Sequence, residues 1–552
     1  MTETGSPASS PLVDEIRAGY AFTGASLEFG AAVEDGTAHP DAIVRIPLSA
    51  MNRHGLVAGA TGTGKTKTLQ LMAEQLAAQG VPVFLADIKG DLSGMATPGE
   101  PNDKVTARAA DVGMDWKPTA YATEFYALGG QGKGIPVRAT VSTFGPTLLS
   151  KVLGLNATQE SSLGLVFHYA DKNGLYLDTL ADLRAVVQHL TSDEGKADLK
   201  ELGGLSSATA GVILRELIGF SDQGADAFFG LNELDTSHLL RTTPDGRGLV
   251  SMLELPSVQD RPALFSTFLM WLLADLFHDL PEVGDVDKPK LVFFFDEAHL
   301  LFNDASKEFL DAIQQTVRLI RSKGVGVFFV TQSPKDVPAD VLAQLGNRVQ
   351  HALRAFTPDD AAALKAAVKT YPHTEYDLEE LLTSLGTGEA VITVLSEKGA
   401  PTPVAWTRMR APESLMAPSP DATIDAAVAA SPLLADYGTA VERDSAFEML
   451  DRAASERVKA DEAAAAAAEK AKVDAAAAAD AEKARVAAEK AAERERLAAE
   501  KARAAQERRE ATEPGVVESV VKSSAFKSIL RSAGTVIGRE ITRSIFGTSR
   551  RR

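Results

Sequence analysis

Residues 59–66 have the types and spacing of a loop that binds phosphate. They read Gly59-Ala60-Thr61-Gly62-Thr63-Gly64-Lys65-Thr66 and match the pattern G-x-x-x-x-G-K-[ST] at every constrained position. Glycines let the backbone curl so that successive N–H groups face phosphate oxygens, and the N-terminus of a following helix adds partial positive charge. We expect Lys65 to reach the β- and γ-phosphates of a nucleotide and the Thr66 hydroxyl to hold Mg²⁺. Thr68, two residues further along, completes the predicted nucleotide-binding set.

Two adjacent acids form the second candidate feature. Asp296 and Glu297 end the apolar run 290–295, which is typical of a strand buried on both faces of a parallel sheet. Ligands bind at the carboxyl ends of such strands. Asp296 is therefore expected to hold Mg²⁺ through water, and Glu297 to polarise the attacking water. Adjacent acids at a strand end also occur as plain surface charge, but together with the phosphate loop they predict hydrolysis of ATP.

Two kinds of element alternate around these residues, as in an α/β fold with a mostly parallel sheet and helices on both of its faces. Strand-like runs are predicted at 55–58, 81–86, 136–141, 249–255, 290–295, 326–330 and 390–395. Helix-like runs are predicted at 66–79, 262–277 and 306–323. This arrangement places the phosphate loop between a strand and a helix, which is the context that the motif requires.

Shifts in composition divide the chain into seven parts. In order, these are a short β-rich lead-in (1–50), the first part of an ATPase core (51–146), a helical insertion (147–240), the second part of the core (241–412), a linker (413–452), a single helix rich in Ala, Glu, Lys and Arg (453–511), and a basic amphipathic segment (512–552). The core is thus predicted to be interrupted once and then completed.

The two C-terminal parts differ in character. The alanine-rich stretch favours one long helix, with acid–base pairs one turn apart such as Glu469–Lys472 and Glu482–Arg485. Its larger apolar residues are too sparse for a coiled coil, which needs one every 3.5 positions. The run 521–552 carries eight basic residues and one acid, with apolar residues at helical spacing. Such a segment docks on an anionic membrane, on a partner or on the protein's own core, and all three stay open.

Composition excludes several classes of protein. The chain has no cysteine, so disulfides, thiol catalysis and cysteine-based zinc sites are excluded. No signal peptide and no apolar stretch of about 18 residues is found, which favours a cytoplasmic protein. The net charge of −18 is uneven, because residues 1–450 carry −23 and residues 451–552 carry +5. This charge argues against a broad basic surface for nucleic acid on the core, but it does not exclude a narrow basic channel in a ring.

Further motifs extend the pattern beyond a phosphate loop. They are Asp87-Ile88-Lys89-Gly90-Asp91, Glu297-Ala298-His299, the stretch 318–326, and Thr331-Gln332-Ser333-Pro334. With the phosphate loop, these motifs resemble the HerA/FtsK branch of hexameric P-loop ATPases, and within it the HerA-like bacterial group of the YjgR type. The resemblance covers roughly residues 25–410 and implies a RecA-like core that uses ATP and Mg²⁺ and assembles as a homo-hexamer.

The same resemblance assigns roles to three residues by position. It implies that Gln332 senses the γ-phosphate, that Arg321 is an arginine finger reaching a neighbouring subunit's nucleotide, and that Arg53 contacts phosphate. Arg318, one turn before Arg321, is a rival for the finger. Arg354 is a further basic candidate near the edge of the sheet.

The substrate on which the predicted ATPase acts has more than one interpretation. The resemblance implies duplex DNA passing through the pore of a ring. The basic C-terminal segment instead indicates a membrane-peripheral ATPase acting on a protein or envelope partner. A nucleotide-dependent scaffold is a third reading, which the intact Glu297 disfavours. HerA partners a nuclease in DNA end processing, but this chain has only about 50 residues in place of an N-terminal barrel, so a nuclease partner stays open.

Overall fold

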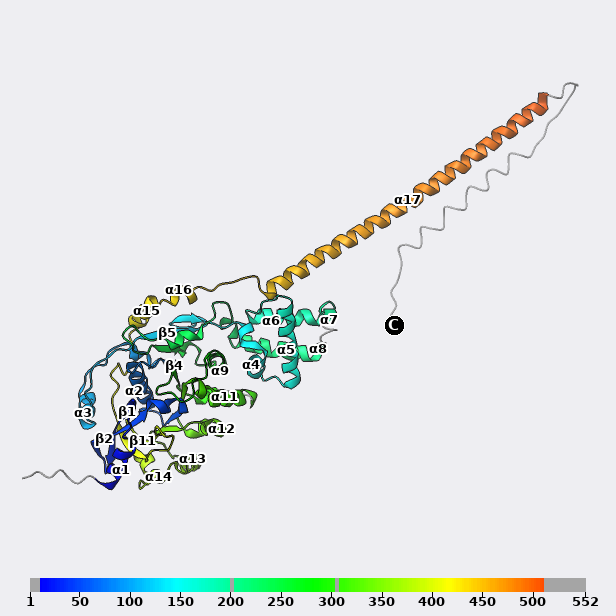
Figure 1. The fold of residues 1–552 in the computed structure, drawn as a ribbon. Helices are drawn as coiled ribbons and strands as arrows, with labels where there is room; N and C mark the ends of the chain where they lie inside the picture. Colours follow the sequence, from blue (N-terminus) through cyan, green and yellow to red (C-terminus); the bar gives the residue numbers. More distant parts are fainter. Residues whose placement is uncertain (1–9, 199–202, 303–306, 511–552) are drawn as a thin grey trace, which may run out of the picture. The chain divides into compact units, whose positions relative to one another are not determined.

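The computed structural model describes residues 10–198, 203–302 and 307–510. The chain forms two units, residues 1–455 and residues 456–552. The first unit holds the phosphate loop and all strands of the described residues, and Figure 1 shows it as a sheet surrounded by helices. The second unit is described through the long helix α17 (Ala446–Glu510), most of which belongs to it.

One twelve-stranded sheet organises the first unit. In spatial order its strands are β2 (Thr37–Pro47), β1 (Ser26–Glu34), β12 (Ala405–Met409), β11 (Glu389–Thr393), β10 (Asn347–Gln350), β3 (Gly55–Ala58), β9 (Val325–Thr331), β8 (Leu291–Phe295), β4 (Val83–Asp87), β7 (Val250–Glu254), β5 (Thr123–Leu128) and β6 (Ile135–Val137). The eight strands from β10 to β6 are parallel, and the four at the other end pair antiparallel. The predicted α/β class with a mostly parallel sheet is confirmed.

The described residues also form seventeen α-helices. They are α1 (Pro11–Gly19), α2 (Lys65–Ala78), α3 (Asp103–Asp111), α4 (Val141–Val152), α5 (Ala157–Lys172), α6 (Leu180–Thr191), α7 (Gly195–Asp198), α8 (Ser207–Asp222), α9 (Pro262–Asp279), α10 (His299–Phe302), α11 (Lys307–Ile320), α12 (Ala339–Leu342), α13 (Pro358–Val368), α14 (Leu378–Ser384), α15 (Asp421–Ala430), α16 (Leu434–Tyr437) and α17.

Helices cover both faces of the sheet, as expected from the continuous apolar strands. In β8, Phe293 and Phe295 face a cluster that includes residues of α4, α5, α6, α8, α9 and α11. Val292 and Phe294 of the same strand face a second cluster that includes α1 and α2. Successive residues of a strand point to opposite faces, so a strand buried on both faces is apolar throughout.

The β-rich lead-in predicted at 1–50 is described from residue 10. Residues 10–50 contain α1 and the long hairpin β1–β2, and β1 pairs with β12 near the end of the core. The hairpin therefore extends the main sheet, because β12 would otherwise leave its backbone hydrogen-bonding groups exposed at an edge. The boundaries predicted for the separate parts of the core stay a prediction. Within the insertion, α4 to α8 gather into one group in Figure 1.

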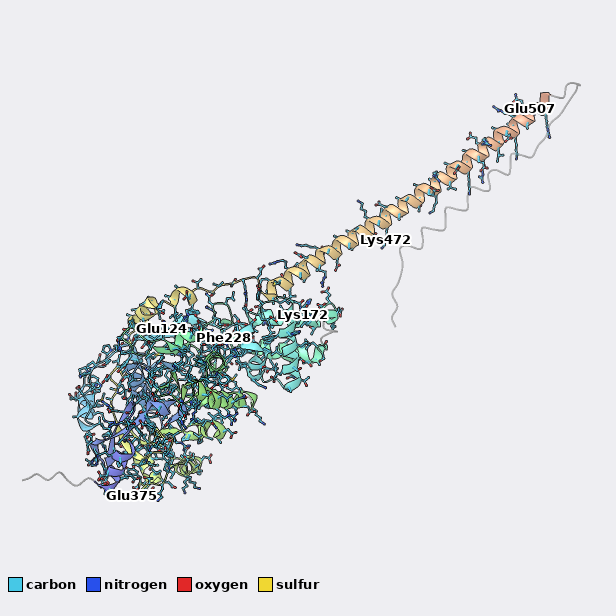
Figure 2. The ribbon with its side chains drawn as sticks, in the orientation of Figure 1. Glu124, Lys172, Phe228, Glu375, Lys472 and Glu507 are labelled. Atoms are coloured by element: carbon cyan, nitrogen blue, oxygen red, sulfur yellow. The ribbon has the colours of Figure 1, made fainter. Side chains whose placement is uncertain are left out.

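The long helix begins earlier than its composition indicates. Glu448 accepts a hydrogen bond from the backbone N–H of Ser445, at 3.0 Å, which fixes the first turn of α17. Along the described part of the helix beyond residue 450, the side chains are exposed, among them Lys472 and Glu507 in Figure 2. The ion pairs Glu469–Lys472 and Glu482–Arg485 both form within it. An exposed, alanine-rich helix of this kind is held by its own backbone and local pairs.

The basic segment predicted at 512–552 lies outside the described residues, so its amphipathic helix stays a prediction. Among the helices that the structure does describe, none combines the length and the apolar character needed to cross a bilayer.

Candidate functional site

The phosphate loop lies between β3 and α2 at the carboxyl edge of the parallel strands. Its first turn is tied to its neighbours, because the N–H of Gly59 donates to the carbonyl of Thr331 at 3.2 Å and that of Ala60 to Ala352 at 2.8 Å. A Cβ on Gly59 would lie 2.5 Å from that of His351, so only glycine fits there. Gly64 precedes α2 with φ of 116° and has no side chain to cap the helix. The N–H groups of that first turn are suited to phosphate oxygens.

Lys65 is buried within the curve of the loop. Its Nζ donates to the carbonyl oxygen of Ala60 at 3.1 Å. Burial lowers the pKa of this ammonium group, and the charges of Glu297 and Asp296 act in the opposite direction. A buried ammonium group with one neutral partner favours a further anionic partner, which is what a nucleotide phosphate would supply.

Asp296 carries the feature that best fits a bound cation. It follows β8, which β9 separates from the phosphate-loop strand β3. Its Oδ1 accepts the N–H of Glu297 at 2.9 Å, whereas its Oδ2 is buried without a hydrogen-bond partner. Burial, with the nearby charge of Glu297, raises the pKa of Asp296 to about 7. An unpartnered buried carboxylate oxygen is costly unless water or a cation satisfies it, so Asp296 fits Mg²⁺ coordination together with Thr66.

Glu297 is held in an unusual backbone conformation. Its φ is +48°, in the left-handed region that residues other than glycine rarely adopt. This turn directs the carboxylate toward the end of β4, where Oε1 pairs with the ammonium of Lys89. Its Oε2 lies 3.2 Å from Nδ1 of His299. Burial acts to raise the pKa of Glu297, but the hydrogen bond and charge of Lys89 outweigh it and lower the pKa below its ordinary value.

Gln332 follows β9, between the strands that carry the phosphate loop and the acids. It lines a cleft of about 690 Å³ together with Ala60, Thr61, His299 and Arg354. The segment holding it is fixed by Asp336, which accepts from the Thr331 hydroxyl at 2.9 Å and from the Ser333 N–H at 2.8 Å. The structure therefore brings Gln332 and Arg354 to the same cleft as the phosphate loop.

Two of the residues predicted to bind nucleotide have other surroundings in this chain. The Thr68 side chain is only 2% exposed, and its hydroxyl hydrogen-bonds Nε2 of His351 at 2.8 Å, so it faces the back of the loop. Arg53 precedes β3, whereas the phosphate loop follows that strand, so Arg53 lies at the opposite edge of the sheet. Thr68 is thus a support for the loop. The predicted contact of Arg53 with phosphate stays a prediction only for a nucleotide bound to another subunit.

Arg321 lies at that same opposite edge, just before β9. Its guanidinium and that of Arg53 both lie 3.6 Å from Oδ1 of Asp285. The parallel strands separate these arginines from Lys65 and Glu297 of the same chain. The assignment of Arg321 as a finger therefore requires a neighbouring subunit.

Sequence reasoning missed two residues that contact the site. Lys89 pairs with Glu297, and His351 lies behind the loop, where its Nδ1–H donates to the carbonyl of Glu389 at 2.8 Å. Burial lowers the pKa of His351 to about 4, so the ring is neutral and its Nε2 accepts from Thr68. Lys89 stood inside a quoted motif, but its role depends on β4 lying beside β8, which spacing alone does not give.

The arrangement of these groups is accompanied by a match to a known family. The family described as the C-terminal part of HerA-like helicases matches residues 33–552, almost the whole chain. The chain belongs to this HerA-like helicase family. The predicted resemblance is confirmed.

Two curated relatives share about a fifth of their aligned residues with this chain. A DNA double-strand break repair helicase HerA of Sulfurisphaera tokodaii is 22% identical over 360 residues, which is 64% of this chain and 64% of that protein. The protein of the same name from Sulfolobus acidocaldarius is 21% identical over 355 residues, covering 63% of this chain and 64% of its own length. The HerA-like chain thus aligns with less than two thirds of each of these helicases.

Solved structures similar to this chain include the bacterial conjugative coupling protein TrwB, with 15% sequence identity and a TM-score of 0.46. The aligned region covers 72% of this chain and 99% of the TrwB chain. VirB4 of Thermoanaerobacter pseudethanolicus has 14% identity and a TM-score of 0.43, with 70% and 97% of the two chains covered. The fold class rests on the sheet of this HerA-like chain itself.

Proposed function

We propose that this HerA-like chain is an ATP-hydrolysing motor that works as a homo-hexameric ring and translocates duplex DNA. The observation that carries the proposal is the placement of three groups along one edge of the sheet. The phosphate loop follows β3, Gln332 follows β9, and Asp296 with Glu297 follows β8. These strands are direct neighbours, so the groups for binding phosphate, sensing it and activating water are adjacent.

Each group has a distinct task in hydrolysis. The N–H groups of the loop and the ammonium of Lys65 hold the phosphates, while Thr66 and Asp296 hold the metal. Mg²⁺ neutralises charge on the β- and γ-phosphates when it is bound. Glu297 takes a proton from the attacking water as it adds to the γ-phosphorus, and the bond to the β-phosphate oxygen breaks to leave ADP and phosphate. The exposed amide of Gln332 can orient that water.

The ring is supported by the placement of the arginines. Arg321 and Arg53 lie at the amino edge of the strands, away from the phosphate loop of their own chain. A guanidinium stabilises charge on a transferring phosphoryl group only when it contacts that group. Side-by-side packing of identical subunits, with the amino edge of one against the carboxyl edge of the next, would supply that contact at every interface.

The proposal that the motor translocates duplex DNA rests on the family to which the chain belongs. The two curated HerA relatives are DNA double-strand break repair helicases. Because residues 1–450 carry −23, a ring of these units would have to concentrate its positive charge in the pore. The basic C-terminal segment supports the second candidate, an ATPase on an anionic membrane surface.

The deciding experiment compares the full-length protein with its Glu297→Gln variant. The variant should bind a fluorescent ATP analogue as the wild type does, and its turnover should fall by roughly 10²- to 10⁴-fold, because only proton transfer is lost. Duplex DNA should stimulate the wild type in a salt-dependent manner. Wild-type turnover in Glu297→Gln would refute the assignment of the base. Stimulation by anionic vesicles and not by DNA would favour the membrane candidate.

A further inference from the structure

Glu297 is engaged by another residue of its own chain. Its Oε1 pairs with Nζ of Lys89, and its side chain is only 5% exposed. The Oε2 atom has no hydrogen-bond partner, although Nδ1 of His299 lies 3.2 Å away. One oxygen of the carboxylate is therefore occupied by an ammonium group, and the other is buried.

An ion-paired carboxylate is a poor general base. A base must accept a proton from a water held within hydrogen-bond reach. Lys89 occupies an oxygen of Glu297 that this water would use. Hydrolysis through Glu297 is therefore impeded while this pair is closed.

The backbone around Lys89 is fixed, whereas its side chain has room to leave. The Asp87 carboxylate, at the end of β4, accepts the N–H groups of Lys89 at 3.2 Å, Gly90 at 2.8 Å and Leu92 at 2.8 Å. The side chain of Lys89 is 47% exposed, in contrast to the buried Glu297. The lysine stem can therefore swing toward solvent without any change in β4 or in the loop.

We propose that Lys89 is a latch on Glu297, whose closed ion pair keeps the motor idle and whose opening frees the carboxylate for catalysis. The latch rests on the proposed function of Glu297 as the base. Lys89 acts through Glu297 and is a positioning residue. In this scheme the lysine lowers the basal rate, which is the opposite of what a lysine bound to phosphate would do.

The test measures basal ATP turnover of the full-length protein without DNA. Lys89→Ala should raise kcat about tenfold, the change expected from removing about 1.4 kcal/mol of barrier, which is close to the strength of one charge-assisted hydrogen bond. KM and the affinity for a fluorescent ADP analogue should not change. Lys89→Arg should retain the low rate because it rebuilds the pair. Lys196→Ala removes a lysine of similar exposure, 50%, which pairs with Asp193 in the segment between α6 and α7, and should behave as wild type.

A kcat in Lys89→Ala that equals or falls below that of the wild type would overturn the latch. Lys89→Met, which keeps the length of the stem, provides a second variant if the alanine variant does not fold. A different result would refute the proposed function, namely normal ATP turnover by the Glu297→Gln variant. If Glu297→Gln is inactive and neither Lys89 variant is faster, the base stands and the latch alone is refuted. The double variant of Lys89→Ala with Glu297→Gln should be inactive.

Discussion

The two edges of the parallel sheet carry different chemistry. The carboxyl edge holds the phosphate loop, the acids Asp296 and Glu297, and Gln332. The amino edge holds Arg53 and Arg321, which share the exposed carboxylate of Asp285. Asp296 and Glu297 on the first edge are buried, and Asp296 has an orphaned carboxylate oxygen, whereas Asp285 is 83% exposed.

This difference indicates how the work is divided between subunits. Binding phosphate and activating water need groups held in a fixed geometry, and those are built into one chain. In the proposed ring, a guanidinium that stabilises the transition state comes from the edge that another subunit presents. The proposal therefore ties hydrolysis to assembly, because a lone subunit would lack the contribution of the far edge.

Removal of the central group of the carboxyl edge should have the largest effect. Lys65→Ala deletes the ammonium group buried in the phosphate loop and should abolish both ATP binding and turnover. Binding is measured with a fluorescent nucleotide and turnover by phosphate release. Lys117→Ala, at an exposed lysine paired with Asp115, is the control and should leave both unchanged. Turnover by Lys65→Ala within tenfold of the wild type would contradict the role of the loop.

Removal of the finger at the amino edge should affect turnover and spare binding. Arg321→Ala is expected to lower kcat about 10³-fold, the lower end for an arginine finger, with nucleotide affinity kept. Mixing Arg321→Ala subunits with Glu297→Gln subunits should restore some turnover, because some interfaces then join an intact acid to an intact arginine. If the mixed rings stay inactive although each variant assembles, the assignment of Arg321 as an arginine finger is refuted.

The sequence predicted the carboxyl edge far better than the amino edge. The strands 55–58 and 291–295 and the residues that follow them belong to local motifs, so chain order alone placed them. The role of Arg53 comes from the family resemblance, and that of Thr68 from its place just after the loop. A strand separates Arg53 from the loop, and the Thr68 hydroxyl hydrogen-bonds His351. The contacts of Lys89 and His351 depend on which strands are neighbours. Short strands such as β10, with four residues, carry too little pattern to predict that order.

A smaller effect is expected at Arg53. Arg53→Ala should lower kcat/KM roughly tenfold, the loss of one charge-assisted contact of about 1.5 kcal/mol to a neighbour's nucleotide. Asp285→Ala is the matched control, since it removes the ion partner of Arg53 and leaves the guanidinium in place. Exposed ion pairs contribute about 0–1 kcal/mol, so this control should keep its turnover. Equal losses in the two variants would show that only the local ion pair matters.

Two buried histidines, one at each edge, allow a finer comparison. Burial lowers the pKa of both His54 and His351 to about 4, below the ordinary value of 6.5. The unfolded chain then binds more protons between pH 6.5 and pH 4. Stability from the neutral rings is therefore complete above pH 6.5 and is lost as the pH falls toward 4. The buried acids Glu74, Asp87, Asp296 and Glu254 have raised pKa values and act in the opposite direction, so only differences between variants are informative.

His54→Gln and His351→Gln should each remove up to about 1.4 kcal/mol per pH unit of this acid-induced loss, as measured by denaturant unfolding at pH 6.5, 5.5 and 4.5. The variants should differ in nucleotide affinity at neutral pH. His351 holds Thr68 in the helix that follows the phosphate loop, so His351→Gln should weaken binding a few-fold. His54 instead accepts the N–H of Val327 at 3.0 Å, at the amino edge, and its variant should bind nucleotide normally. Equal nucleotide affinity in both variants would mean that the hydrogen bond between His351 and Thr68 does not affect nucleotide binding. The functional difference between the two edges would then rest on the arginines alone.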